Sequence, residues 1–256
     1  MKLVIDLDRR TVSVDDLGRK TTHSLSSPEA FSAVSRAWLH CGWDTKHVYT
    51  FTWLGRPIIQ LPEDLLRIQE VIYALKPDLI LETGIAHGGS LIFYASLCRL
   101  LDRGRVIGVD VALRDHNRRA IQQHELAPYI TLVDGSSVDP AVVGKVRSMI
   151  APGEVVLVVL DSNHSRDHVA AELEAYSGLV CLGSYIVATD GIMRDLVGAP
   201  RSAADWGSNN PFAAAEEFLR RHPEFTLEPP RWQFNESEGL QEAVTYWPGA
   251  WLRRTR

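Results

Sequence analysis

The sequence predicts an α/β fold of the doubly wound, Rossmann-like kind, with a mostly parallel sheet, helices on both faces and a small N-terminal extension. Two observations predict it. Short apolar segments alternate with amphipathic ones from Pro62 to Asp190, and polar residues stand directly after the apolar segments. Strands that alternate with helices are joined by right-handed crossovers, which make the strands parallel.

Composition limits the possible functions. The 256 residues are enough for one large α/β domain with a substantial core. A net charge of −5 argues against a nucleic-acid partner, and Arg253 to Arg256 is interpreted as a solvated tail. No apolar run reaches the roughly 20 residues that span a bilayer, so no membrane association is expected.

Cysteine usage and the first residues bear on location. Cys41, Cys98 and Cys181 form no CxxC pair and are interpreted as buried free thiols in a reducing compartment. Asp6 interrupts the first apolar residues too early for a signal peptide. We therefore expect a cytoplasmic protein.

Residues 1–60 are expected to form an N-terminal extension, and residues 61–256 the main domain. Residues 3–7 and 11–14 predict a hairpin, and Ser27-Pro28 predicts the start of a helix. The extension is rich in aromatic residues, which predict a packing surface in a homo-oligomer. A role in lining a substrate site is the alternative. These residues are Trp38, Trp43, Tyr49, Phe51 and Trp53.

The main domain is predicted to begin with an amphipathic helix at residues 62–75, because Leu65, Ile68 and Ile72 recur at helical spacing. Further elements follow in regular alternation. Strands are expected at residues 79–82, 105–110, 130–133, 155–160 and 185–188, and helices at 90–101, 116–124, 138–150 and 166–176.

The ends of the first three strands predict a nucleoside site. Glu82 is followed by a glycine-containing turn that includes Ala86, and a structural loop is the alternative for this turn alone. Asp110 is suited to a ribose diol, and the turn from Asp134 to Ser136 to an adenine edge. The pattern matches neither GxGxxG nor a Walker motif. Ligands bind at the carboxyl ends of such strands, so we expect a bound adenosine cofactor.

The next two strand ends predict a metal and acceptor site. Asp161 follows the most apolar strand, and Asp190 stands at the tip of the next one. Paired carboxylates suit a hard cation such as Mg²⁺, which would hold an acceptor hydroxyl and lower its pKa. His164, three residues beyond Asp161, is the candidate general base, which makes Asp161 and His164 the candidate catalytic residues.

Other interpretations of these residues remain open. Asp161 is also placed to cap the following helix, and His164 to lie on the surface. His87 is interpreted as a packing or cofactor-contact residue, and His168 as solvated.

Several motifs in order resemble the cephalosporin hydroxylase family, which includes rhamnosyl O-methyltransferases. They are WLGRPIIQLPED at residues 53–64, LETGIAHGGS at 81–90, DSNHS at 161–165, GSYIV at 183–187 and PGAWLRR at 248–254. The resemblance covers nearly all of residues 50–254.

The resemblance implies a Rossmann-like S-adenosylmethionine-binding domain with bound Mg²⁺. It places Asp161 and Asp190 at metal positions and His164 at the position of a general base. With Ala86 and Ser136 from the two turns, the candidate cofactor-binding residues are Glu82, Gly84, Ala86, Ser90, Asp110, Asp134 and Ser136.

One departure from the family pattern concerns the metal. Thr189-Asp190 stands where the family has an acidic pair, so Thr189 brings a neutral hydroxyl to the predicted metal site. The loss of one negative charge should weaken cation binding, and water can fill the vacant coordination position.

The resulting hypothesis is an S-adenosylmethionine-dependent O-methyltransferase that acts on a small-molecule hydroxyl. The resemblance favours a sugar hydroxyl of a natural product. A second hypothesis, from the family name alone, is an oxygenation step in antibiotic tailoring. A third is a non-catalytic, cofactor-binding scaffold, which the neutral residue at Thr189 favours.

Overall fold

The structure, a computed structural model, describes residues 2–237 and 239–256. It divides into two compact units, one made of Met1–His47 and Trp232–Thr245, the other of Val48–Arg231 and Tyr246–Arg256. This division differs from a boundary at residue 60, because Trp53 belongs to the larger unit. Its ring packs edge-on against Phe93, with centroids 4.9 Å apart, and its indole N–H donates to Ser96 over 3.1 Å.

The smaller unit contains a three-stranded antiparallel sheet of β1 (Lys2–Asp6), β2 (Thr11–Asp16) and β3 (Arg19–Ser24), followed by α1 (Pro28–Asp44). The predicted hairpin is confirmed, and β3 extends it. The sequence did not reveal β3, because its residues are polar and lack apolar alternation. Ser27 caps α1 as expected, since its side chain accepts from the backbone N–H of Ala30 over 3.2 Å.

The larger unit is built on a seven-stranded sheet of order β11-β12-β10-β9-β6-β7-β8. The five strands from β10 to β8 are parallel, and β12 is antiparallel to both neighbours. The strands are β6 (Leu79–Thr83), β7 (Arg105–Asp110), β8 (Ile130–Asp134), β9 (Val156–Leu160), β10 (Tyr185–Ala188), β11 (Phe225–Leu227) and β12 (Trp251–Arg254). A separate small ribbon pairs β4 (Thr52–Trp53) with β5 (Arg56–Pro57).

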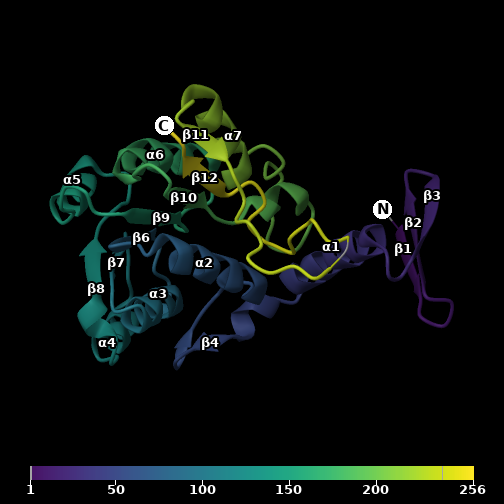
Figure 1. Ribbon diagram of the computed structural model, residues 1–256, viewed down its shortest axis with the longest axis horizontal. Coiled ribbons are helices and arrows are strands. Elements are labelled where there is room, and N and C mark those ends of the chain that lie inside the picture. Colours follow the sequence, from purple (N-terminus) through teal and green to yellow (C-terminus); the bar gives the residue numbers. More distant parts are fainter. Residues whose placement is uncertain (1, 238) are drawn as a thin grey trace. The chain divides into compact units, whose positions relative to one another are not determined.

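Helices cover both faces of this sheet (Figure 1). One face carries α2 (Pro62–Leu75), α3 (Gly89–Leu100) and α4 (Asp115–Gln122), and the other α5 (Pro140–Ser148), α6 (Arg166–Tyr176) and α7 (Pro211–Arg221). Single 3-10 turns occur at η1 (His47–Thr50), η2 (Ala127–Tyr129), η3 (Ser177–Leu179) and η4 (Gly191–Asp195). The predicted doubly wound, mostly parallel α/β fold is confirmed.

The central strands are buried on both faces, which explains why they are continuously apolar rather than alternating. Leu79 and Leu81 of β6 belong to the core cluster that also contains the inward residues of α5, α6 and α7. Successive strand residues point to opposite faces, so Ile80 and Glu82 point toward the α2–α3 side. β6 therefore carries the Glu82 carboxylate toward the side of the sheet that α2 and α3 cover.

The C-terminal residues correct one prediction. Arg253 and Arg254 are not in a solvated tail, because β12 lies between β10 and β11. Arg253 forms an ion pair with Glu228 at 2.7 Å, and Arg254 donates to the carbonyl oxygen of Val180 over 2.8 Å. A four-residue strand that ends in two arginines has little apolar character, which is why the sequence did not reveal it.

The prediction of three buried free thiols is only partly confirmed. All three thiols are free, but only Cys98 is buried, while Cys41 is exposed and Cys181 is partly exposed. Among the described residues, no helix is both long and apolar enough to cross a bilayer.

Candidate functional site

The strand order places a crevice beside β6. The chain runs from β6 outward to β7 and β8 and then returns to the other side of β6 as β9. At such a reversal the loops after the two central strands lead in opposite directions, and ligands bind between them. A pocket of about 180 Å³ lies there, lined by parts of residues 57–60 and 84–90 together with Asp110, Asp161 and Ser162.

Gly84 allows the loops after β6 and β9 to touch. Its φ of +85° is unfavourable for residues with a side chain, and a Cβ there would lie 2.0 Å from the carbonyl oxygen of Asp161. The backbone N–H of Asp161 in turn donates to the carbonyl oxygen of Thr83 over 2.9 Å. The two loops are therefore in contact beneath the pocket.

Glu82 is a buried carboxylate beside the pocket. Ser90, which lines the pocket, donates its hydroxyl to Oε2 of Glu82 over 2.7 Å. Oε1 is buried and has no hydrogen-bond partner among the described residues. Burial and, secondly, the charge of Asp161 hold the pKa of Glu82 well above its usual range. An unsatisfied carboxylate oxygen of this kind is suited to a ligand that donates a hydrogen bond or carries positive charge.

Asp110 is held at the pocket by two backbone donors. The N–H of Ile85 donates to Oδ2 over 2.9 Å, and the N–H of Ala112 donates to Oδ1 over 2.8 Å. These bonds fix the carboxylate and leave each oxygen free to accept one further bond. That geometry suits a vicinal diol.

The structure does not bring every candidate residue into the pocket. Gly84, Ala86, Ser90, Asp110 and Asp161 line it together, whereas Asp134, Ser136 and Glu82 do not. Asp134 forms an ion pair with Arg118, and its side chain is 68% exposed. The turn after β8 therefore lies outside the pocket.

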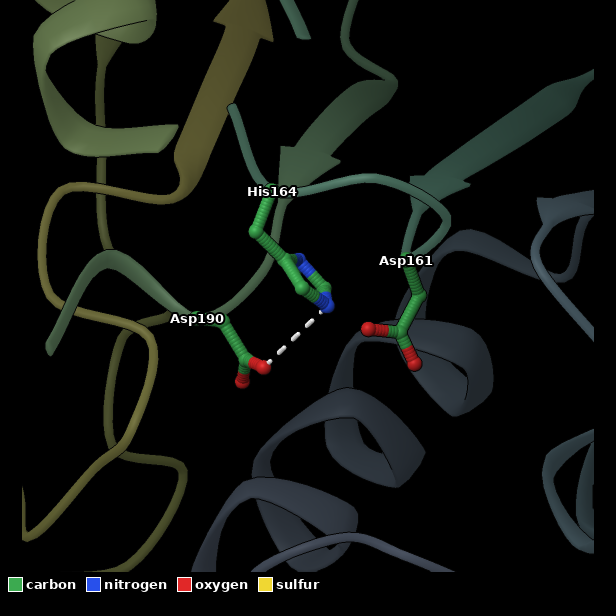
Figure 2. A group of neighbouring side chains, drawn as sticks. All are labelled: Asp161, His164 and Asp190. Carbon is green, nitrogen blue, oxygen red and sulfur yellow. Dashed lines mark ion pairs between the residues drawn. The ribbon is translucent and has the colours of Figure 1, made fainter. Parts of the chain in front are cut away.

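A cluster of three side chains adjoins the pocket through Asp161. Figure 2 shows Asp161, His164 and Asp190 directed toward a common point. One ligand atom from each lies within 4.8 Å of the other two, and Nε2 of His164 is 3.5 Å from Oδ2 of Asp190. Asp190 has a φ of +57°, a left-handed conformation that Asp adopts more readily than most residues. This conformation orients its carboxylate at the end of β10.

The electrostatics of the cluster favour a cation. Burial and the neighbouring charge of Asp190 raise the pKa of Asp161 to about 7, and burial also raises the pKa of Asp190. Two carboxylates are thus held together at a cost in free energy that a bound cation would offset. The cap interpretation of Asp161 fails, because its side chain bonds to residues outside α6, and His164 faces Asp190 rather than open solvent.

Two contacts of Asp161 were not predicted from the sequence, although Thr189 itself was named as a residue of the metal site. Gln60 donates its side-chain N–H to Oδ2 of Asp161 over 2.8 Å, although 101 positions separate them. Thr189 is buried, with its hydroxyl 2.7 Å from Oδ1 of Asp161 and 2.9 Å from the carbonyl oxygen of Leu160. Gln60 lies before α2 and does not follow a strand of the sheet. The only sequence signal for a role of Gln60 was therefore its place in the motif QLPED.

Two further histidines, His87 and His168, lie at or beside the pocket. His87 lines the pocket, and its carbonyl oxygen accepts from Arg56 over 2.6 Å. The prediction for His168 is wrong, because its side chain is only 21% exposed and lies against Ser137, Ser162 and Glu172.

The sequence model of the rhamnosyl O-methyltransferase/CmcI family matches residues 45–255. The rhamnosyl O-methyltransferase of Mycobacterium leprae (strain TN) is 29% identical over 177 residues, which cover 68% of this chain and 72% of that protein.

Two solved structures share the fold. An apo structure of CmcI has a TM-score of 0.56 at 18% identity and matches 81% of this chain and 77% of its own. CmcI with Mg and SAM has a TM-score of 0.53 at 17% identity and matches 81% and 78%. The family match spans most of the chain, and the fold agrees with it. The chain therefore belongs to the rhamnosyl O-methyltransferase/CmcI family and is an O-methyltransferase.

Proposed function

We propose that this protein transfers a methyl group from S-adenosylmethionine to a hydroxyl of a small, sugar-bearing acceptor, with a divalent cation beside that hydroxyl. One observation carries the proposal: the pocket at the β6–β9 crevice shares Asp161 with the Asp161–His164–Asp190 cluster. A cofactor site and an acceptor site are thus contiguous. The relatives are named for a rhamnosyl acceptor, and CmcI has been solved with Mg and SAM.

The residues present fit S-adenosylmethionine. Glu82 adjoins the pocket through Ser90, and we assign its unsatisfied Oε1 to the ammonium group and Asp110 to the ribose hydroxyls. The absence of a side chain at Gly84 lets a ligand approach the backbone closely. The pocket volume of about 180 Å³ is below the ~300 Å³ typical of small-molecule sites, so the nucleoside would extend past Asp110 toward Asp134 and Ser136.

The residues also fit a divalent cation. Asp161 and Asp190 provide carboxylate oxygens, and Thr189 supports Asp161 through its hydroxyl. Mg²⁺ is commonly bound by one or two carboxylates and several waters, so this donor set is sufficient.

When bound, the cofactor supplies an activated methyl group, and the cation lowers the pKa of the acceptor hydroxyl. The protein has to bring the acceptor oxygen to roughly 3 Å from the methyl carbon, in line with the departing sulfur. His164 is placed to accept the hydroxyl proton at Nε2, and Asp190, 3.5 Å away, stabilises the resulting imidazolium.

The proposal also concerns the roles of the two units and the assembly of the protein. We place catalysis in the larger unit, whereas a domain at 61–256 with an extension at 1–60 was expected from the sequence. Exposed aromatic rings at Trp38 and Tyr49 support the expectation of a homo-oligomer.

The decisive experiment incubates the protein with methyl-labelled S-adenosylmethionine, Mg²⁺ and a panel of rhamnosylated acceptors, with and without oxygen. Mass spectrometry that shows one added methyl group on the acceptor, independent of oxygen, supports the proposal. A product that forms only in oxygen would favour the oxygenation hypothesis. Calorimetric binding of S-adenosylhomocysteine without turnover on any acceptor would favour the scaffold hypothesis.

A further inference from the structure

Helix α6 carries a buried carboxylate that the proposed chemistry does not use. Glu172 is fully buried, Ser162 donates its hydroxyl to Oε1 over 2.7 Å, and Oε2 has no hydrogen-bond partner among the described residues. The nearby basic group is His168, one helical turn earlier, with Nε2 3.5 Å from Oε1 of Glu172. Burying a carboxylate is unfavourable unless neighbouring groups compensate its charge, so we expect Glu172 and His168 to do more than fill space in the core.

His168 lies between two loops. Its Nε2 is 3.2 Å from the hydroxyl oxygen of Ser137 and 3.2 Å from that of Ser162. The neighbouring Glu172 carboxylate raises the pKa of His168, which favours a protonated Nε2 whose single N–H the two serine oxygens share. One turn further along the same helix face, Tyr176 donates its hydroxyl to the carbonyl oxygen of Ser137 over 2.6 Å.

The two serines belong to segments that the sheet does not join. Ser137 follows the end of β8 and Ser162 follows the end of β9, and β6 and β7 lie between these strands. Ladder hydrogen bonds therefore cannot fix one loop against the other. The described side chains that bond to both loops include His168, with Glu172 behind it.

The geometry points to His168 and Glu172 as positioning residues that fix the nucleoside end of the site relative to its metal end. Ser162 directly follows Asp161 and lines the pocket, while Ser137 directly follows the turn from Asp134 to Ser136. The inference rests on the proposed function, because it assigns those two loops to the two ends of one ligand site.

A double-mutant cycle tests the connection. S-adenosylhomocysteine binding is measured by calorimetry, with Mg²⁺ present, for Ser137→Ala, Ser162→Ala and the double variant. Each single change is expected to weaken binding about threefold or more. The loss of affinity in the double variant should be much smaller than the product of the two single losses. In a His168→Ala background the two effects should multiply. Equal coupling with and without His168 would overturn the inference.

Conservative variants separate positioning from folding. Glu172→Gln keeps an acceptor for Ser162 and the same volume, so affinity should stay near that of the wild type. Glu172→Ala leaves His168 and Ser162 without this partner and should weaken binding about tenfold. Val169→Ala is the matched control, because Val169 is buried in the core cluster and its apolar side chain forms no hydrogen bond with either loop. It should lower the melting temperature and leave ligand affinity unchanged.

The outcomes distinguish this inference from the proposed function. If the wild-type protein fails to bind S-adenosylhomocysteine, the proposed function fails first. If it binds, and His168→Ala binds equally well with a normal KM and kcat, the positioning role alone is wrong. Loss of affinity in Val169→Ala equal to that in Glu172→Ala would also overturn it, because general destabilisation would then account for both.

Discussion

The hydroxyl oxygen of Thr189 lies 2.7 Å from Oδ1 of Asp161, so the neutral residue directly before Asp190 contacts the carboxylate at the end of β9. Gln60 donates to the other oxygen, Oδ2, over 2.8 Å. Both oxygens of Asp161 are thus oriented by neutral groups. The geometry supports an indirect role for Thr189 in cation binding, in which its hydroxyl orients the Asp161 carboxylate.

Removing the Thr189 hydroxyl should weaken cation binding while the fold persists. Thr189→Val has nearly the same shape but no donor, so Mg²⁺ affinity should fall about tenfold, the effect of losing one hydrogen bond to a charged group. Thr189→Ser keeps the donor and should bind Mg²⁺ nearly as well as the wild type. Calorimetric titration measures both, and equal Mg²⁺ affinities in all three proteins would contradict this role.

The pKa of Asp161 predicts an unusual pH dependence of stability. The folded-state pKa is raised to about 7, whereas an unfolded Asp titrates near 4. The group therefore contributes stability that is fully present below about pH 4 and is lost as the pH rises through about 7. Urea unfolding without metal should show this loss between those values.

Asp161→Asn is the control for that prediction, because the amide cannot ionise. The difference in unfolding free energy between wild type and variant should change with pH across the same window. Mg²⁺ should restore the wild-type protein above about pH 7 and have little effect on the variant. A difference that does not change with pH would mean that Asp161 titrates normally.

Replacing His164 tests the proposed proton acceptor. His164→Ala should lower kcat by about 10²-fold or more and leave S-adenosylhomocysteine affinity nearly unchanged, because the imidazole faces Asp190 and does not line the pocket. Single-turnover kinetics and calorimetry measure the two quantities. Unchanged turnover would exclude His164 as the base.

Glu82→Gln should separate stability from binding. Removing a buried, partly unsatisfied acid should raise the melting temperature of the ligand-free protein by about 2–4 °C, the shift expected for ~1 kcal/mol. The same change should weaken S-adenosylhomocysteine binding about tenfold or more, because a neutral amide replaces the proposed partner of the ammonium group. Tighter binding in the variant would contradict that role.

Gly84→Ala tests the close contact between the loops after β6 and β9. Gly153 provides the control, because its φ of +87° matches the +85° of Gly84 but a Cβ there meets nothing within 4 Å. Both substitutions impose the same backbone strain, and only Gly84→Ala adds a clash with Asp161. Urea unfolding should therefore show a larger loss for Gly84→Ala, by about 1–3 kcal/mol. Equal losses of unfolding free energy in the two variants would show that the loops after β6 and β9 are not in close contact at Gly84.

The sequence predicted the parallel core and the strand ends well, for a physical reason. Buried parallel strands are continuously apolar, so a polar residue directly after one, such as Asp110 or Asp161, is conspicuous. The parallel arrangement then places these strand ends on one edge. The fold and the neighbourhood of the pocket therefore follow from local patterns.

What the sequence did not reveal depends on tertiary contacts. Gln60 reaches Asp161 from the segment before α2, and no periodicity marks that approach. His168 resembles a solvated helical residue until Ser137 and Ser162 converge on it. Short strands such as β12 are stabilised by their neighbours and carry little propensity of their own.

The placement of β12 has a consequence for how the protein matures on the ribosome. The N–H of Ala188, at the end of the strand that presents Asp190, donates to the carbonyl oxygen of Ala250 over 2.9 Å. Translation proceeds from the N-terminus, so β6, β7 and β9 emerge well before residue 250. The loops after β6 and β7 can take up their places during synthesis, whereas the end of β10, which presents Asp190, gains its backbone bond to Ala250 only after residue 250 has left the exit tunnel.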